Sequence, residues 1–81
     1  MPNILRQDGF RIVIYLDDHL PSHVHVFRAD EEVKISLGNA TTRPKIIELR
    51  GKPRTGVKAL EIVIQHQTEL LKAWETIHGN A

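Results

Sequence analysis

The hydrophobic period of this chain changes once, near residue 55, and that change limits the folds it can adopt. Up to about residue 50 apolar and polar residues alternate, as in a half-buried strand, and after residue 56 apolar residues recur every three or four positions, as along one face of a helix. The helical stripe consists of Leu60, Val63, Ile64, Gln67, Leu70, Leu71, Trp74 and Ile77, with Gln67 as its one polar member. A sheet followed by one long C-terminal helix is predicted.

The alternating part divides into four segments. They read "FRIVIYL" (10–16), "HVHVFR" (23–28), "VKISL" (33–37) and "KIIELR" (45–50). Asp8–Gly9 is a turn signal before the first segment, and the polar residues 29–32 join the second and third as a hairpin. We therefore expect an α+β fold in which three to four antiparallel strands carry one helix on one face, as a single domain over residues 1–81.

The composition narrows the class of protein. Eighty-one residues allow one core, and 41% hydrophobic with 26% charged residues is typical of a globular domain. The net charge of +1 lacks the basic excess of many nucleic-acid-binding domains. The absence of cysteine excludes disulfides and thiol nucleophiles. No signal peptide and no apolar stretch of membrane-spanning length is present, so a cytoplasmic protein that does not enter a membrane is expected.

One helix covers one face of a sheet, which leaves the other face open. The face predicted to lie under the helix carries Phe10, Ile12, Ile14, Leu16, Val24, Val26, Val33, Ile35 and Leu37. The opposite face carries Val13, Tyr15, His23, His25 and Phe27. We predict that these five residues form an uncovered, partly apolar surface that binds a partner.

The stretch "DDHLPSHVHV" (17–26) concentrates three of the five histidines. Residues two apart in a strand point the same way, so His23 and His25 can converge on one ligand. With Asp18 or His19 from the preceding loop they are candidate ligands of a divalent metal. Without a metal, His23, His25 and Asp18 are candidate acid–base catalysts acting on a phosphodiester.

Less specific interpretations of these residues stay open. Asp17 and Asp18 are also typical turn residues, and strand histidines are often half-exposed structural residues. A basic group near the ends of the predicted fourth strand is a candidate nucleic-acid site or a solvated surface. It consists of Arg43, Lys45, Arg50, Lys52 and Arg54.

The whole chain resembles a family of small bacterial proteins catalogued as a domain of unknown function. The resemblance rests on "MPNILR", "GFRIVIY", the block Asp18, His19, Pro21, His23, His25, the "VKISL" segment and the ending "LLKAWE". Leu20 stands where the family pattern more often has a second proline. The resemblance implies a component of a two-protein module, sometimes labelled toxin–antitoxin-like, and it supplies no catalytic residue.

We favour a non-enzymatic interaction domain of such a module, with a small partner protein or a second copy of the chain on the uncovered face. No cofactor is expected on that hypothesis. A small metal- or histidine-dependent hydrolase acting on RNA or another phosphodiester is the alternative, and a nucleic-acid-binding regulator is a further one.

Overall fold

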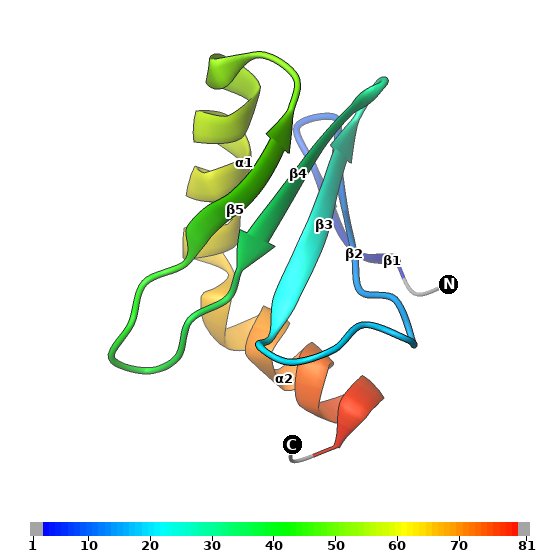
Figure 1. Ribbon diagram of the computed structural model, residues 1–81, viewed down its shortest axis with the longest axis vertical. Helices are drawn as coiled ribbons and strands as arrows, with labels where there is room; N and C mark the ends of the chain where they lie inside the picture. The colour runs from blue at the N-terminus through cyan, green and yellow to red at the C-terminus, as the bar shows by residue number, and fades with distance from the viewer. Residues whose placement is uncertain (1–2, 80–81) are drawn as a thin grey trace.

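The computed structural model describes residues 3–79, which form a five-stranded antiparallel sheet and two helices (Figure 1). The strands are β1 (Asn3–Gln7), β2 (Phe10–Val13), β3 (His23–Arg28), β4 (Glu31–Ser36) and β5 (Lys45–Arg50), and the helices are α1 (Pro53–Gln65) and α2 (Gln67–His78). Each strand pairs with its neighbours in sequence, in the order β1-β2-β3-β4-β5. The predicted α+β class is confirmed, with one more strand than expected and two helices in place of one.

The additional strand is β1, which pairs with β2 through the turn at Asp8 and Gly9. Both turn residues have positive φ, 52° and 81°, as a two-residue hairpin turn requires. The sequence indicated this turn but not the strand before it. Because β1 is a short edge strand in which no residue is fully buried, its sequence carries little of the alternation that marks a strand.

Strand β2 ends at Val13, three residues before the predicted end. Ile14 is still buried, but Leu16 is 73% exposed and does not join the core face as predicted. The chain leaves the sheet here, and residues 14–22 form a loop that leads to β3.

The predicted single helix is divided at His66. Its N–H donates to the carbonyls of Ile62 and Val63, and it has a non-helical ψ of 19°. The polar member of the apolar stripe, Gln67, directly follows the break. Its side-chain amide donates to the carbonyl of Leu37 at 2.8 Å and to those of Asn39 and Thr42 at 3.0 Å, which ties the β4–β5 loop to the start of α2.

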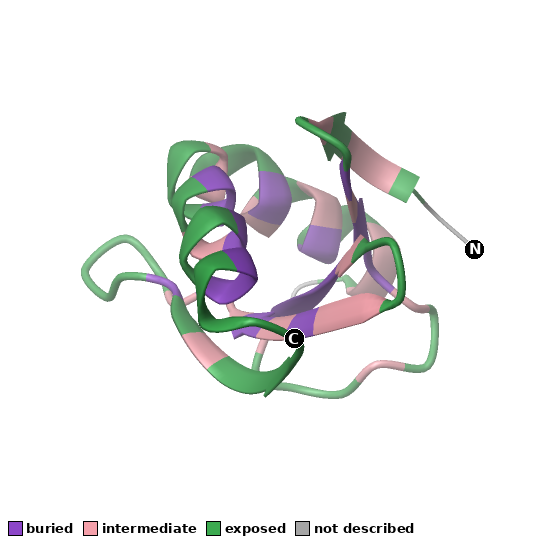
Figure 2. Ribbon diagram, turned by 90° about the horizontal axis from the view of Figure 1, so that it is seen from above, coloured by how far each residue is buried: buried purple, intermediate pink, exposed green. Residues whose placement is uncertain are grey.

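The helices pack inside the curve of the sheet, and the buried residues of the two layers face each other (Figure 2). The core consists of Phe10, Ile12, Ile14, Val24, Val26, Val33, Ile35, Leu37, Ala59, Ile62, Val63, Leu70 and Trp74. The predicted core face is therefore right apart from Leu16. In the helical stripe, Leu60 is only half-buried and Ile64 is 41% exposed. Neither helix in residues 3–79 has the length and apolar character needed to cross a membrane.

The pairing register also defines the opposite face of the sheet. Residues directly opposite each other in antiparallel strands point to the same side. One row across the sheet is therefore Val13, His25, Lys34 and Glu48. The rows on either side of it contain His23, Ser36 and Lys45, and Arg11, Phe27, Glu32 and Arg50. The face opposite the core therefore carries His23 and His25, together with Glu32 and Lys34.

Candidate metal centre

The loop of residues 14–22 places a carboxylate next to the strand histidines. The N–H of Tyr15 donates to Asp18 Oδ2 at 2.9 Å, and the N–H of Asp18 donates back to the carbonyl of Tyr15 at 3.2 Å. This closed turn fixes the Asp18 side chain at the end of β3. Asp18 is therefore a turn residue and also a neighbour of the two histidines.

Asp18, His23 and His25 converge. Asp18 Oδ1 lies 3.3 Å from His23 Nε2 and 3.2 Å from His25 Nε2. One nitrogen or oxygen ligand atom from each of the three residues lies within 4.8 Å of the others. His23 and His25 are 7% and 9% exposed, so the cluster is largely shielded from solvent. We call these three residues the Asp18–His23–His25 cluster.

The other ring nitrogen of each histidine also has a hydrogen-bond acceptor. His23 Nδ1 donates to the carbonyl of Pro21 at 2.9 Å, and His25 Nδ1 donates to Glu32 Oε2 at 3.2 Å. Carbonyl and carboxylate acceptors on the outer nitrogen are the usual supports of metal-ligating histidines, because they fix the tautomer and the orientation of the ring.

These contacts bring hydrogen-bond acceptors together at the centre of the cluster. A neutral imidazole has one N–H and one lone pair, and here Nδ1 carries the N–H of both rings. The lone pairs of both Nε2 atoms then point at Asp18 Oδ1, which is also an acceptor. A cation between the three atoms would satisfy all three acceptors at once.

The charge state of Asp18 suits a cation. Burial raises the pKa of the Asp18 carboxyl, but the Tyr15 N–H together with His25 and His23 lowers it by more, so this pKa lies below its usual value. The carboxylate is therefore ionised at neutral pH, which a metal ligand must be.

Aromatic contacts hold the two imidazoles in place. The ring of Tyr15 lies edge-on to His25 at 4.7 Å between centroids, and Trp74 of α2 lies 5.5 Å from His23. His78, also on α2, stacks on Trp74 at 4.1 Å and donates from Nε2 to the carbonyl of Tyr15 at 3.1 Å. Trp74 is 4% exposed, as expected for a core residue, and it also supports the cluster.

The remaining metal candidate, His19, is exposed and is not part of the cluster. The sequence did not single out Glu32, which lies on β4 diagonally across from His25. Glu32 belongs to a polar turn in the sequence, and only the hairpin register places it beside His25.

The surface predicted for partner binding differs from what was expected. Val13 is fully buried, and His23 and His25 are nearly so, which contradicts the prediction that they are exposed on an open face. Tyr15 and Phe27 are half-buried. The reason is that the loop of residues 14–22 and the end of α2, and not a further helix, close over this part of the sheet. Partner binding itself stays a prediction.

The predicted basic group is exposed throughout but does not form one site. Arg43 and Lys45 lie at the start of β5, and Arg50, Lys52 and Arg54 lie at or beyond its end. A six-residue strand is roughly 20 Å long, so the two ends cannot contact one phosphate together. Nucleic-acid binding by these residues also stays a prediction.

A cavity of about 420 Å³ opens beside the Asp18–His23–His25 cluster. It is lined by Asp17, Asp18, His19, Leu20, Pro21, His23, Lys34 and Ile47. Two of the three residues of the cluster therefore face a space that a small molecule can enter.

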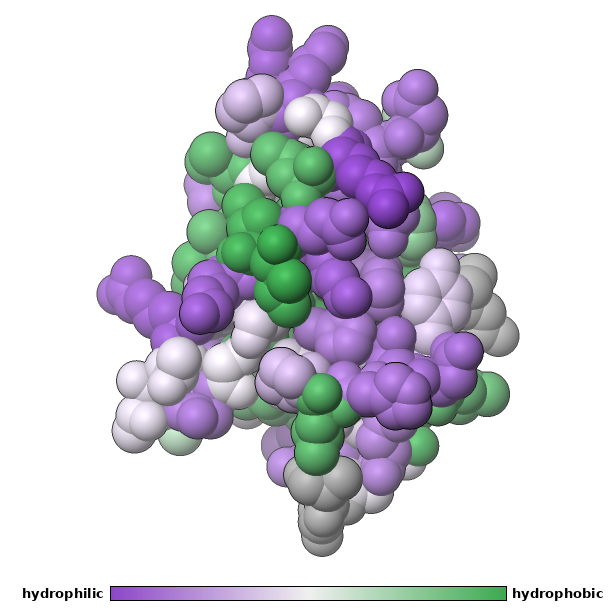
Figure 3. All heavy atoms as spheres, viewed as in Figure 1, coloured by the Kyte–Doolittle hydropathy of each residue, from purple (hydrophilic) through white to green (hydrophobic). Residues whose placement is uncertain are grey.

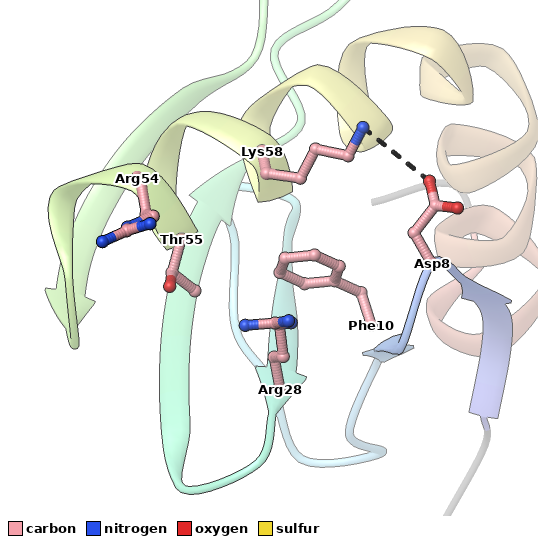
Figure 4. A pocket seen from close by; sticks show the side chains of 6 residues that line it. All are labelled: Asp8, Phe10, Arg28, Arg54, Thr55 and Lys58. Carbon is pink, nitrogen blue, oxygen red and sulfur yellow. Dashed lines mark ion pairs between the residues drawn. The ribbon is translucent and has the colours of Figure 1, made fainter.

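A second cavity, of about 230 Å³, lies between the β1–β2 turn, β3 and α1 (Figure 4). Two of its three basic residues already have partners within the fold: Lys58 pairs with Asp8 at 3.8 Å, and the Arg28 guanidinium lies 5.6 Å from the centre of the Phe10 ring, whereas the third is Arg54. The adjacent start of α1 is occupied as well, because Glu31 Oε1 accepts the N–H of Lys52 at 2.8 Å. The chemistry available at this cavity is weaker than at the cluster.

A family model described as "Domain of unknown function (DUF4160)" matches residues 9–75. The chain belongs to the DUF4160 family. The DUF4160 match includes the whole Asp18–His23–His25 cluster together with Glu32, Lys34 and Trp74, and it confirms the resemblance to a domain of unknown function. No curated protein matches this DUF4160 chain, and no solved structure matches it either.

Proposed function

We propose that this domain binds one divalent transition-metal ion through Asp18, His23 and His25, and that it is a metal-dependent hydrolase. The observation that carries the proposal is the orientation of the rings. Both Nδ1 atoms donate outward to acceptors, and both Nε2 atoms point at one oxygen of Asp18.

The distances within the cluster are compatible with a shared ion. Asp18 Oδ1 lies 3.2 Å from His25 Nε2 and 3.3 Å from His23 Nε2. Donor atoms about 2.0–2.2 Å from one ion lie about 2.8–3.6 Å from each other in tetrahedral or octahedral geometry. Both Asp18 distances fall inside that range, and one ligand atom from each of the three residues lies within 4.8 Å of the others.

The donor types indicate which ions fit. Two imidazole nitrogens and one carboxylate oxygen suit Zn²⁺, Fe²⁺ or Mn²⁺ better than Mg²⁺ or Ca²⁺, which prefer oxygen ligands throughout. Zn²⁺ is the natural first probe because it has no redox chemistry and accepts a tetrahedral site with three protein ligands.

Three protein ligands leave a coordination position for water, and the cavity beside the cluster gives that position access to a substrate. A divalent ion in such a site lowers the pKa of its bound water to about 7, which makes hydroxide available at neutral pH. The burial of both rings and the closed turn at Asp18 limit the movement of the three side chains. Hydrolysis is the reaction that this arrangement supports best.

Metal-free acid–base catalysis is less well supported. A catalytic histidine needs a ring nitrogen within reach of the substrate proton. All four ring nitrogens of His23 and His25 already lie within 3.3 Å of a protein acceptor, so neither ring presents a free nitrogen to the cavity.

A competitive zinc titration against a chromogenic chelator tests the proposal. We expect one zinc per chain for the wild type and a loss of affinity of at least about 100-fold for Asp18→Asn and for His25→Ala, since changes even to outer residues cost 10–100-fold. His19→Ala, on the same loop, serves as the matched control and keeps wild-type affinity. Circular dichroism checks that each variant is folded. Equal zinc affinity in a His23→Ala/His25→Ala double variant would overturn the proposal.

Partner binding is the second candidate, and the observation that favours it is the outer edge of β5. The sheet order leaves this edge without a paired strand within the described residues, and it carries Ile47 and Leu49, which are 49% and 36% exposed. Figure 3 shows a hydrophobic patch over β5. An added strand from a small partner protein fits such an edge. Ile47→Lys should abolish capture of that partner if the edge is the interface, whereas an unchanged complex would exclude this edge.

A further inference from the structure

The cavity beside the Asp18–His23–His25 cluster also contains a cation that the fold does not neutralise. Lys34 lies on β4 directly opposite His25 and on the same face of the sheet. It is half-buried and lines the cavity together with Asp18 and His23. No carboxylate of residues 3–79 lies within ion-pair distance of its ammonium group: its other cross-strand neighbour, Glu48, pairs with Arg50 at 3.4 Å.

We propose that the substrate of this site is a phosphate ester of about nucleotide size, whose phosphoryl oxygens lie between the metal ion and the Lys34 ammonium. This inference rests on the proposed metal-dependent hydrolase. An ion and an unpaired ammonium at the same cavity favour an anionic group with several oxygens, and a phosphoryl group provides them.

The rest of the cavity indicates the organic part of the ester. Leu20 and Ile47 present apolar side chains that are 56% and 49% exposed, at a cavity that they help to line. Apolar walls bind a ring or a sugar and not a free inorganic ion. A volume of about 420 Å³ lies within the range of about 300–1,000 Å³ that is typical of small-molecule sites.

The reaction balances with water as the only co-substrate. The water oxygen forms a bond to phosphorus, the ester P–O bond breaks, and the departing oxygen takes up one proton of the water. Lys34 takes no part in the proton transfer and stabilises the negative charge on the phosphoryl oxygens. Its role is therefore electrostatic and positional, and it is separate from the generation of the nucleophile.

The test separates metal binding from anion binding. Zinc affinity of the wild type, Lys34→Ala and Lys34→Arg is measured first, and we expect all three to agree within about threefold, because Lys34 is not a ligand. Next, ³¹P line broadening by the Mn²⁺-loaded protein gives the affinity for adenosine 5′-monophosphate and for inorganic phosphate. We expect Lys34→Ala to weaken the binding of both by at least tenfold, and Lys34→Arg to restore most of it. Lys45→Ala, an exposed lysine on the same face, is the matched control and leaves both unchanged.

Each outcome has a defined meaning. Zinc binding without any phosphorus broadening would overturn the phosphate-ester inference and leave the metal site standing, whereas absence of zinc and Mn²⁺ binding would overturn both. Equal losses for Lys34→Ala and Lys45→Ala would show general charge attraction and contradict the role of Lys34. Equal affinity for adenosine 5′-monophosphate and inorganic phosphate would contradict the contribution of Leu20 and Ile47. Turnover of bis(4-nitrophenyl) phosphate compared with 4-nitrophenyl phosphate distinguishes diester from monoester substrates.

Discussion

His25 Nδ1 lies 3.2 Å from Glu32 Oε2, across the hairpin of β3 and β4. This contact connects the ring of a buried histidine to a carboxylate that is 36% exposed. It fixes which ring nitrogen faces Asp18, because Nδ1 contacts Glu32 and Nε2 is then the nitrogen near Asp18 Oδ1. The hairpin register therefore determines the chemistry of the Asp18–His23–His25 cluster.

Glu32→Gln should weaken zinc binding by about 10-fold or more and leave the fold intact, because the neutral amide is a poorer acceptor for His25 Nδ1–H. Glu48→Gln is the matched control, since Glu48 lies on the same face but contacts Arg50 and not a histidine. Competitive zinc titration of the two variants provides the comparison. Identical affinities in both variants would contradict the supporting role of Glu32.

Burial predicts which apolar residues stabilise the fold. Ile35→Ala should lower the free energy of unfolding by about 2–5 kcal/mol, because Ile35 is fully buried between the sheet and α1. Val57→Ala, on the exposed side of α1 at 59% exposure, should change it by no more than about 0.5 kcal/mol. Urea denaturation measures both, and comparable losses would mean that the assigned core face is wrong.

Glu31 gives the domain a pH-dependent stability. The N–H of Lys52 and the hydroxyl of Thr55 donate to its carboxylate, and these bonds hold the pKa of Glu31 below its usual value. A carboxyl whose pKa is lower in the folded state stabilises the fold fully above its unfolded pKa, near 4.5, and loses that contribution as pH falls through the folded value. Glu31→Gln should therefore be less stable than the wild type at pH 7, with the difference shrinking below about pH 4. Thermal unfolding of the wild type and Glu31→Gln at pH 7 and below about pH 4 measures this difference in stability. A difference that grows in acid would contradict the lowered pKa of Glu31.

The sequence predicts much of this fold because local patterns determine it. Alternation in residues 23–28 and 33–37 identified the central hairpin and its core face correctly, since Val24 and Ile35 are both fully buried. The helix break was not predicted, because the pattern treats Gln67 as an interruption of a stripe and not as a donor to a loop 25–30 residues away.

The sequence also predicted part of the candidate site, because that part depends on local sequence. His23, His25 and Asp18 are close in sequence, so their convergence was among the hypotheses. Strand register and helix packing bring Glu32, Lys34 and Trp74 close to the cluster, and no local pattern contains this information. The burial of Val13 also depends on where the loop of residues 14–22 folds, and the sequence alone does not specify that path.

X-ray absorption at the zinc edge of the loaded wild-type protein tests the metal site most directly, because it counts the ligands. We predict a first shell of nitrogen and oxygen atoms at about 2.0–2.1 Å with the outer-shell scattering of two imidazoles, which falls to one imidazole in His25→Ala and stays at two in Asp18→Asn. A first shell without imidazole scattering, or one that is unchanged in a His23→Ala/His25→Ala double variant, would contradict the metal centre.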